Sequence, residues 1–209
     1  MSKGEAMNRI IFATGNQGKL KEIKEIMAGL PLEVLSMKEA GLSVEVEENG
    51  STFVENALIK ARGLAALLKE KNIEAIAMAD DSGLEIDALN KEPGVYSARY
   101  MGENTSYRIK NAKLIERLEG VPVEKRTARF VCEIAMVLPD GREKTARGTI
   151  EGKIGYEERG ENGFGYDPIF YLPDMSRTTA ELSPEDKNEI SHRGVALRKI
   201  EKELADILA

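Results

Sequence analysis

Two consecutive acidic residues occupy a position in the sequence that suits catalysis. Asp80 and Asp81 directly follow a short apolar segment, residues 76–79, and Ser82 and Gly83 come next. Adjacent acids are common in a chain with 36 Asp and Glu among 209 residues, so the doubling itself indicates nothing. Their position after a predicted strand does indicate a function, because α/β sheets bind ligands where strands end. Mg²⁺ prefers carboxylates together with phosphate oxygens, so the pair could bind this ion. A turn with two solvated acids is the alternative.

A second acidic pair lies in a predicted turn. Glu47 and Glu48 precede Thr52 and Glu55, which have the spacing of a helix capping box. The partial positive charge of a helix N-terminus favours nearby acids, and this alone explains the pair. The functional alternative is that the pair supplies a second metal ligand.

A glycine-containing turn connects the first predicted strand to the first predicted helix. It consists of Thr14, Gly15, Asn16, Gln17, Gly18 and Lys19. Free N–H groups at a helix start attract phosphate, and the charge of Lys19 adds to them. The turn is not a Walker P-loop, since two residues separate Gly15 from Gly18 and Leu20 follows the lysine, and the dinucleotide pattern GxGxxG does not occur. An ordinary tight turn is the alternative.

Two aromatic residues are flanked by glycines in the segment 162–168. Phe164 and Tyr166 alternate with Gly163 and Gly165. A ring presented by such a loop can stack on a nucleobase, which contributes ~1–3 kcal/mol per base. A structural turn with one of the two rings in the core is equally compatible with these residues.

The only histidine, His192, precedes Arg193 and follows Lys187 by five residues. A single histidine excludes a metal site built from histidines, and the absence of GxSxG gives no support to a catalytic triad. His192 and Arg193 together offer donors for acceptor atoms of a ligand. A surface or capping role is the more usual one for a lone histidine.

The elements that must position these residues alternate between strands and helices. Apolar, β-branched stretches predict strands at residues 9–13, 33–36, 76–79 and 84–88, with residues 80–83 as an exit loop. Apolar spacing of three and four predicts helices from residue 19 to the helix-ending Pro31 and at residues 52–71, 105–118 and 191–208. Pro139-Asp140-Gly141 predicts a β-hairpin of residues 127–138 and 143–154, and Ser183-Pro184 predicts a further helix start. We therefore expect a mixed-sheet α/β protein.

Composition indicates a globular chain and restricts its partners. The 209 residues contain no clear linker, so we expect one domain over 1–209, with residues 1–6 as a disordered extension and Met7 as an alternative start. A net charge of −6 lacks the basic footprint of a nucleic-acid-binding protein. The single cysteine, Cys132, excludes an internal disulfide and fits a reducing cytoplasm. The longest apolar runs of about six residues are far below the ~18 that span a membrane, so we expect no membrane partner.

Six segments of the chain together form a distinctive sequence pattern. ATGNQGK, EENGSTFVENALIKAR, DDSGL, PGVYSARY, GFGYDPIF and TAELSPEDKNEISHRG follow one another between about Asn8 and Leu197. In order and spacing they resemble the inosine triphosphate pyrophosphatase family. The resemblance implies an elongated mixed β-sheet with flanking helices, two lobes around a central cleft, and a cytoplasmic homodimer. It also implies Mg²⁺-dependent hydrolysis of ITP, dITP and XTP to the monophosphate and pyrophosphate, which keeps these nucleotides out of DNA and RNA.

The resemblance further implies roles for individual residues. Asp81 matches the catalytic carboxylate, and Glu47 looks like a magnesium ligand shared with Asp81. Substrate contacts are implied for Thr14, Gly15, Asn16, Gln17, Gly18, Lys19, Lys60, Ser82, Phe164, Gly165, Tyr166, Asp167, Lys187, His192 and Arg193. The first six of these resemble a phosphate-binding loop, and residues 164–167 resemble a base-binding loop. Asn162 and Asp186 depart from the usual glycine and glutamate, and neither is among these contacts.

The chemistry of a triphosphate suggests a mechanism for such a site. Lys19, Lys187 and Mg²⁺ would neutralise the anion, and Asp81 would position and deprotonate a water that attacks the α-phosphorus. Donors of His192 and Arg193 would suit the 6-keto oxygen of hypoxanthine or xanthine. The 6-amino group of adenine would leave them unpaired, at a cost of ~1–3 kcal/mol per group. Guanine also carries a 6-keto oxygen, so the donors do not explain its exclusion.

Two other functions stay open on the residues alone. One is a pyrophosphatase for other nucleotides, such as modified pyrimidines, which a substrate panel would separate. The other is a non-catalytic nucleotide-binding regulator, which needs the phosphate loop and the aromatic loop but not two metal-binding acids. A nucleic-acid-binding module fits the acidic chain least.

Overall fold

The computed structural model describes residues 9–29, 31–44 and 46–208. The predicted extension at residues 1–6 and the alternative start at Met7 lie outside this range. The strands are β1 (Arg9–Phe12), β2 (Glu33–Ser36), β3 (Ile76–Ile86), β4 (Thr127–Val137), β5 (Glu143–Ile154) and β6 (Phe170–Tyr171). The longer helices are α1 (Gln17–Ile26), α2 (Phe53–Glu70), α3 (Tyr107–Arg117), α4 (Pro184–Ile190) and α5 (His192–Leu208).

The described strands form one mixed sheet in the order β2-β1-β3-β4-β5-β6. β1 pairs in parallel with β2 and with β3, whereas β5 and β6 are antiparallel. The predicted mixed-sheet α/β class is therefore confirmed, and so are the two strands and the turn of the predicted hairpin. The chain divides into two compact units: unit 1 contains residues 1–81, 132–148 and 193–209, and unit 2 contains residues 82–131 and 149–192.

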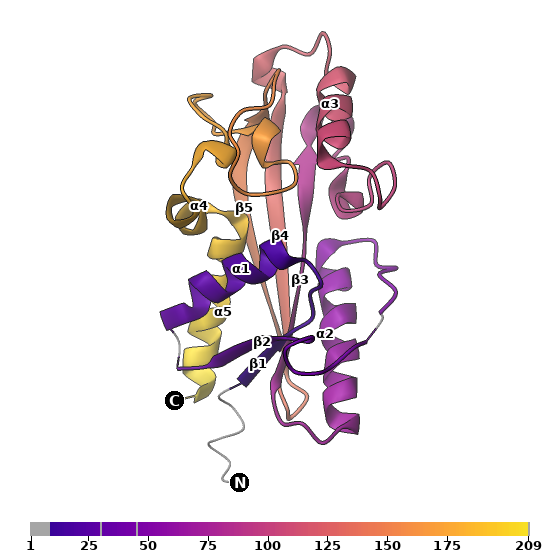
Figure 1. The fold of residues 1–209 in the computed structure, drawn as a ribbon, viewed down its shortest axis with the longest axis vertical. Coiled ribbons are helices and arrows are strands. Elements are labelled where there is room, and N and C mark those ends of the chain that lie inside the picture. Colours follow the sequence, from indigo (N-terminus) through magenta and orange to yellow (C-terminus); the bar gives the residue numbers. More distant parts are fainter. Residues whose placement is uncertain (1–8, 30, 45, 209) are drawn as a thin grey trace. The chain divides into compact units, whose positions relative to one another are not determined.

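Unit 1 has helices on both faces of its part of the sheet. Alternate residues of a strand point to opposite faces, and those with the parity of Ile10 and Met78 pack against α1 and α5. Those with the parity of Ile11 and Ala77 pack against the apolar face of α2. Figure 1 shows α2 along one side of these strands and α1 and α5 along the other. Any side chain of unit 1 that points out of β3 therefore meets a helix.

The long helix α2 begins at the residue that the capping pattern predicts. The Thr52 side chain accepts a hydrogen bond from the Glu55 N–H, and the Glu55 carboxylate accepts one from the Thr52 N–H in return. Such a box satisfies two N–H groups that the helix leaves unpaired. Because the cap fixes the first turn, the residues that follow it on the inner face, including Asn56 and Lys60, have fixed positions along β3.

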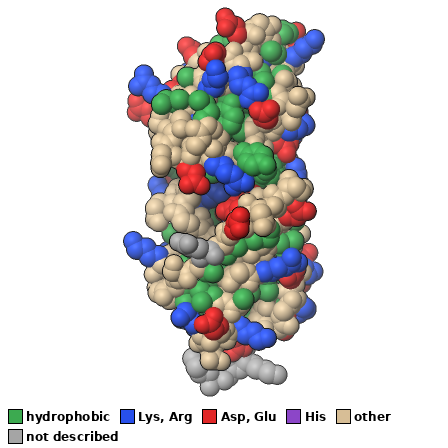
Figure 2. Space-filling model, turned by 90° about the vertical axis from the view of Figure 1, so that its right-hand side faces the viewer, with side chains coloured by type: hydrophobic (Ala, Val, Ile, Leu, Met, Phe, Trp, Pro, Cys, Tyr) green, Lys and Arg blue, Asp and Glu red, His purple; other side chains and the backbone are tan. Residues whose placement is uncertain are grey.

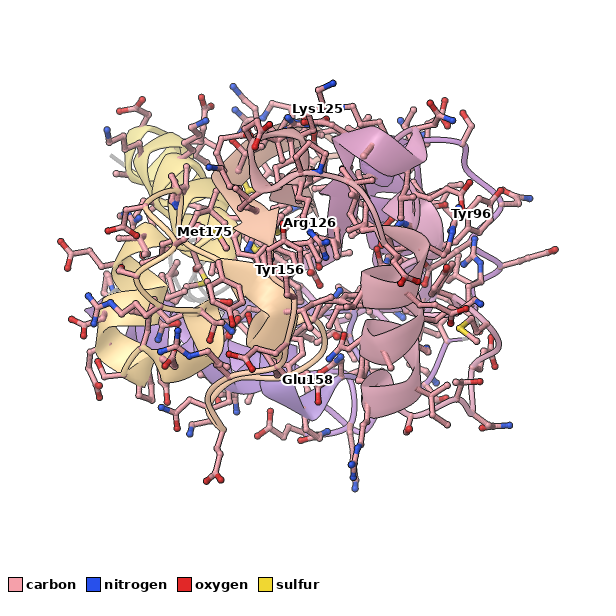
Figure 3. All side chains as sticks on the ribbon, turned by 90° about the horizontal axis from the view of Figure 1, so that it is seen from above. Tyr96, Lys125, Arg126, Tyr156, Glu158 and Met175 are labelled. Carbon is pink, nitrogen blue, oxygen red and sulfur yellow. The ribbon has the colours of Figure 1, made fainter. Side chains whose placement is uncertain are left out.

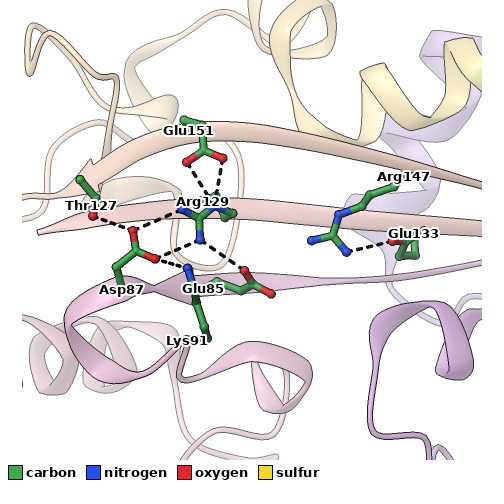
Figure 4. Close-up of polar contacts among 8 residues, drawn as sticks. All are labelled: Glu85, Asp87, Lys91, Thr127, Arg129, Glu133, Arg147 and Glu151. Carbon is green, nitrogen blue, oxygen red and sulfur yellow. Dashed lines mark hydrogen bonds and ion pairs between the residues drawn. The ribbon is translucent and has the colours of Figure 1, made fainter.

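Unit 2 has one apolar and one charged face in its part of the sheet. Leu84, Phe130 and Ile154 belong to a buried cluster that includes Leu114 of α3. The opposite face carries Arg129, which makes ion pairs with three carboxylates of neighbouring segments (Figure 4). These carboxylates are Glu85, Asp87 and Glu151, at 3.5, 3.0 and 2.9 Å. Glu133 and Arg147 of unit 1 form a further ion pair of 3.0 Å in the same view.

A buried arginine ties together three segments of unit 2. The guanidinium of Arg126 donates to the carbonyl oxygens of Leu118, Ile154 and Gly155 at 3.2, 2.8 and 2.6 Å. The ring of Tyr156 covers it at 4.2 Å, and both residues are labelled in Figure 3. Burial lowers the pKa of Arg126. Arg126 therefore holds the end of α3 against the ends of β4 and β5.

The distribution of surface charge and the polarity of the helices concern two classes of partner, nucleic acids and membranes. Figure 2 shows Lys and Arg side chains interspersed with Asp and Glu over the described residues of one face. Within the described part of the chain, every helix is too short or too polar to cross a membrane.

The prediction for the acidic pair was wrong in one respect. The sequence predicted a strand that ends at residue 79 and an exit loop at residues 80–83. In the structure β3 runs without interruption from Ile76 to Ile86, and the two acids lie in its middle. Polar partners on both faces replace the water that such carboxylates would otherwise need.

Candidate active site

Asp81 points from β3 toward α2 and is nearly buried. Its Oδ2 accepts a hydrogen bond of 3.2 Å from the side-chain amide of Asn56. Its Oδ1 lies 3.5 Å from the ammonium nitrogen of Lys60. Asn56 and Lys60 are four residues apart on α2, so both occupy one helix face. The helix thus supplies one neutral donor and one cation to a single carboxylate.

The acidic turn before α2 is fixed to the same group of residues. The Gly50 N–H donates to the Asn56 side-chain oxygen at 2.9 Å, so Asn56 joins the turn to Asp81. A Cβ at Gly50 would lie 2.7 Å from that oxygen, and only glycine permits this approach. Glu48 contacts Lys60 at 3.2 Å. Glu47 is exposed, and its carboxylate enters none of the ion pairs among the described residues.

Burial and charge act in opposite directions on this group. Burial raises the pKa of Asp81 above its ordinary value, and the ammonium groups of Lys60 and Lys19 offset only part of that effect. Burial alone would lower the pKa of Lys60, but Asp81, Asp80 and Glu48 outweigh it and raise that pKa. Lys60 is therefore charged at neutral pH, and Asp81 is a stronger base than an exposed aspartate.

Asp80 points to the opposite face of β3, toward α1 and α5. Its Oδ2 lies 2.9 Å from the Lys19 ammonium and 3.4 Å from the Arg193 guanidinium. Arg193 also pairs with Glu22 of α1. Burial would raise the pKa of Asp80, but these cations dominate and hold it well below its ordinary value. The result is a buried chain of alternating charges from Glu22 through Arg193 and Asp80 to Lys19.

The glycine turn ends in a capped helix with a free first turn. The Asn16 side chain accepts from the Lys19 N–H at 3.2 Å, and the Thr14 hydroxyl accepts from the Asn16 N–H at 3.2 Å. The N–H groups of Gln17 and Gly18 belong to the first turn and have no partner within the helix. α1 carries no acidic residue in that turn. The turn therefore offers donors and a partial positive charge to an anion.

In unit 2, Asp167 organises the predicted base-binding loop. Its carboxylate accepts from the Phe164 N–H at 2.8 Å, from the Lys187 ammonium at 2.7 Å and from the Thr179 hydroxyl at 2.8 Å. Gly163 has a φ of +75°, and a Cβ there would overlap this carboxylate. The loop thus closes tightly around one buried acid, and that acid is occupied by the protein itself.

The two aromatic residues of the loop have different surroundings. Tyr166 is buried, donates from its hydroxyl to the Ser97 carbonyl at 2.6 Å, and packs edge-on against Tyr107. Burial raises the pKa of Tyr166 above its ordinary value. Phe164 is half-buried, and the Lys187 ammonium lies 5.0 Å from its ring centre. The structure therefore gives Tyr166 a core position, whereas Phe164 is half-buried, and stacking of its ring on a base stays a prediction.

The predicted donors His192 and Arg193 are not a matched pair in the structure. The His192 ring is buried and stacks on Phe130 in unit 2, with ring centres 5.0 Å apart. Arg193 belongs to unit 1, where its guanidinium meets Glu22 and Asp80. Direct contact of Arg193 with a base stays a prediction. Ser82, half-buried in β3, likewise stays a predicted substrate contact.

The donor set around Asp81 fits a hard divalent cation with few protein ligands. No three His, Cys, Asp or Glu side chains gather as a ligand group within the described residues. Mg²⁺ commonly takes one or two carboxylates and completes its shell with water and phosphate oxygens. Asp81 already faces a cation, the Lys60 ammonium, and the acidic turn brings one further carboxylate, that of Glu48, to the same ammonium. The residues therefore fit the predicted metal.

Several residues of these clusters were missed by the sequence predictions. Asn56 lies within the segment EENGSTFVENALIKAR, four positions before Lys60, and this helical spacing is the signal that points to it. Glu22 follows Lys19 by three positions on α1, so the same argument applies. Asn111 of α3 donates to Glu158 and to the Gly165 carbonyl at 2.7 and 3.4 Å. No local pattern indicates that contact.

Known proteins match this sequence over nearly its whole length. The sequence pattern of the Ham1 family matches residues 10–203. The dITP/XTP pyrophosphatase of Caldanaerobacter subterraneus is 50% identical over 196 residues, which cover 94% of this chain and 96% of the relative. The dITP/XTP pyrophosphatase of Bacillus subtilis is 48% identical over 196 residues, again 94% and 96% of the two chains.

Solved structures agree as well. The Staphylococcus aureus Ham1 protein superposes with a TM-score of 0.81 at 44% identity, covering 95% of this chain and 98% of that one. The nucleoside-triphosphatase / dITP/XTP pyrophosphatase of Mycobacterium abscessus gives a TM-score of 0.70 at 40% identity, covering 92% and 98%. Both identities are high enough to carry more than a likeness of fold.

Proposed function

The chain belongs to the Ham1 family, the family that its motifs resemble, and on that premise we propose that it hydrolyses dITP, XTP and ITP to the nucleoside monophosphate and pyrophosphate. The observation that carries the proposal is Asp81, a nearly buried carboxylate with a raised pKa, held by Asn56 and Lys60. A nucleotide-binding regulator has no need of a strengthened base at this position.

Unit 1 supplies the groups that bind phosphate. The first turn of α1 presents the N–H groups of Gln17 and Gly18, and Lys19 adds a charge whose position Asp80 fixes at 2.9 Å. Lys60 adds a second ammonium beside Asp81. A triphosphate carries several negative charges, so its binding requires such a concentration of donors and cations.

Asp81 acts as the general base in this proposal. Asn56 donates to its Oδ2 and the Lys60 ammonium lies beside its Oδ1, so the carboxylate is held in place to orient a water and take its proton. Attack of that water on the α-phosphorus expels pyrophosphate, and proton removal of this kind contributes ~10²–10⁴-fold to a rate. The raised pKa of Asp81 improves the proton transfer.

The proposal also includes a bound Mg²⁺ ion. Glu47 and Asp81 would hold Mg²⁺, as the family resemblance implies, and Glu48 is engaged by Lys60. When bound, the ion supplies positive charge that polarises the phosphoryl group.

Unit 2 supplies base recognition. The half-buried ring of Phe164 is the stacking surface, and Lys187 lies against it, held by Asp167. A hydrogen-bond donor at the base, such as the Lys187 ammonium, favours a 6-keto oxygen over the 6-amino group of adenine, because leaving a buried donor unpaired costs free energy.

A homodimer and a cytoplasmic location belong to the same proposal and rest on the family resemblance. Analytical ultracentrifugation measures the oligomeric state.

The experiment compares dITP, XTP, dATP and dGTP with Mg²⁺ in water labelled with heavy oxygen. We expect pyrophosphate from dITP and XTP, with the label in the monophosphate, and turnover of dATP slower by at least about a hundredfold. Orthophosphate as the product, or label in pyrophosphate, would contradict attack at the α-phosphorus. Binding of dITP without turnover under any divalent metal would favour the regulator.

A further inference from the structure

Lys60 holds a position that a metal ion would also favour. Its ammonium nitrogen lies 3.5 Å from Asp81 Oδ1 and 3.2 Å from Glu48 Oε2. The Lys60 side chain is only 14% exposed, so water does little to screen these contacts. A charged side chain thus neutralises the carboxylate to which the proposed reaction would bind its metal.

The surrounding contacts show that this arrangement is built into unit 1. The capping box fixes the start of α2, and Asn56 joins Asp81 to the backbone of Gly50. Glu48 lies in the same turn, and its Oε2 accepts a hydrogen bond of 3.2 Å from the Lys60 ammonium. Lys60 therefore has two anionic anchors, one from β3 and one from the turn.

Two cations cannot share one side of a carboxylate without strong repulsion, because like charges a few ångströms apart destabilise each other. A divalent ion at Asp81 must displace the Lys60 ammonium. An incoming triphosphate offers that ammonium a new set of anionic oxygens. Metal and nucleotide together can therefore displace the Lys60 ammonium from Asp81 more readily than the metal alone.

We propose that Lys60 is a resident competitor for the metal: paired with Asp81 and Glu48 it weakens metal binding to the free enzyme, and transfer of its ammonium to the phosphates opens the site. This inference rests on the proposed function for its metal and its triphosphate. Its consequence is reciprocal coupling, in which nucleotide strengthens metal binding and metal strengthens nucleotide binding by the same factor. Lys60 thereby keeps the free protein from binding metal unproductively.

The test is a Mn²⁺ titration of the nucleotide-free protein followed by electron paramagnetic resonance, since Mn²⁺ shares the preference of Mg²⁺ for carboxylates. Lys60→Met should bind Mn²⁺ at least about tenfold more tightly than the wild type. Lys60→Arg, which retains the charge, should stay close to the wild type. Lys24→Met is the matched control, because it removes a lysine of unit 1 whose partner is the more exposed Glu39.

Equal or weaker Mn²⁺ binding by Lys60→Met, relative to the Lys24→Met control, would overturn the inference. Should Lys60→Met fail to fold, Lys60→Gln has a similar length and can still donate to Asp81, and the same tightening is expected. The titration contains no nucleotide, so it is independent of turnover. If the wild type hydrolyses dITP but Lys60→Met shows no tightening, only the competitor role is rejected. If Lys60→Met tightens but the wild type does not hydrolyse dITP, only the proposed function is rejected.

Discussion

Asp80 and Asp81 are neighbours in the chain, yet their carboxylates lie on opposite faces of β3. Asp80 meets Lys19 and Arg193 on the side of α1 and α5, and Asp81 meets Asn56 and Lys60 on the side of α2. The pKa of Asp80 is lowered and that of Asp81 is raised. One acid is thus a permanent counter-ion inside a charge network, and the other retains basicity. Substitutions of the two residues should separate stability from catalysis.

Asp81→Asn should abolish most of the activity and leave the fold intact. The change removes the proton acceptor, so kcat for pyrophosphate release should fall by ~10²–10⁴-fold. Burial already disfavours the ionised form of Asp81, so a neutral isostere should change the free energy of unfolding by less than about 1 kcal/mol. Steady-state kinetics and urea unfolding measure the two quantities. Near wild-type turnover would remove Asp81 from its proposed role.

Asp80→Asn should give the opposite result for stability. Arg193 is fully buried, and losing one of its two carboxylate partners leaves uncompensated charge in the core. Breaking a buried ion pair from one side costs about 3–5 kcal/mol. Lys19 would also lose its anchor, so KM should rise as well. Unfolding by urea within about 1 kcal/mol of the wild type would show that the network carries little energy.

The two acids of the turn should differ in their effect on metal dependence. Glu48 is engaged by Lys60 at 3.2 Å, whereas the exposed Glu47 is free to turn toward an arriving ion. Glu47→Gln should raise the Mg²⁺ concentration for half-maximal activity by at least about tenfold. Glu48→Gln is the matched control and should change it much less. The reverse order would transfer the metal-ligand role to Glu48.

The elements around the site differ in how far the sequence predicts them. The start of α2 is predictable because its capping box is entirely local, and Thr52 and Glu55 form it as expected. The hairpin of β4 and β5 is predictable for the same reason, since Pro139-Asp140-Gly141 separates two strand-like segments. The continuity of β3 is not, because Asp-Asp-Ser-Gly is typical of a turn. Only partners from distant segments make it a strand.

Those partners are separated from β3 by long stretches of chain. Glu22 and Arg193 are 171 residues apart, and no local spacing indicates their contact. The choice between Phe164 and Tyr166 as the stacking ring has the same difficulty. It depends on the Ser97 carbonyl, which lies 69 residues from Tyr166 and fixes that ring in the core. Motif resemblance predicts the site residues, but which of them face a ligand depends on packing.

Phe164 and Tyr166 should therefore respond differently to substitution. Phe164→Ala removes a stacking surface worth ~1–3 kcal/mol, so KM for dITP should rise by about five- to a hundredfold with little loss of stability. Tyr166→Phe removes only the hydroxyl that donates to Ser97, which should lower stability by ~0.5–1.5 kcal/mol and leave KM nearly unchanged. Phe164→Tyr should retain stacking. A large KM effect confined to Tyr166→Phe would exchange the two roles.

Asp87 should give unit 2 an acid-sensitive part of its stability. Hydrogen bonds from Lys91, Thr127 and Arg129 lower the pKa of this carboxyl in the folded protein below its ordinary value of 3.8. A depressed pKa means that the unfolded chain binds the proton more readily, so the stabilisation is complete well above pH 3.8 and is lost as the pH falls through the folded-state pKa. The partly exposed position limits the contribution to about 1 kcal/mol.

Asp87→Asn should accordingly destabilise the protein by about 1 kcal/mol at pH 7, and the difference from the wild type should shrink steadily below about pH 4. Urea unfolding between pH 3 and pH 7 measures it, and Asp206→Asn, at an exposed position of α5, is the matched control. High salt should reduce the effect at pH 7, since the groups around Asp87 are partly open to solvent. A difference that stays constant with pH would mean that the hydrogen bonds of Asp87, rather than its charge, stabilise this face of the sheet.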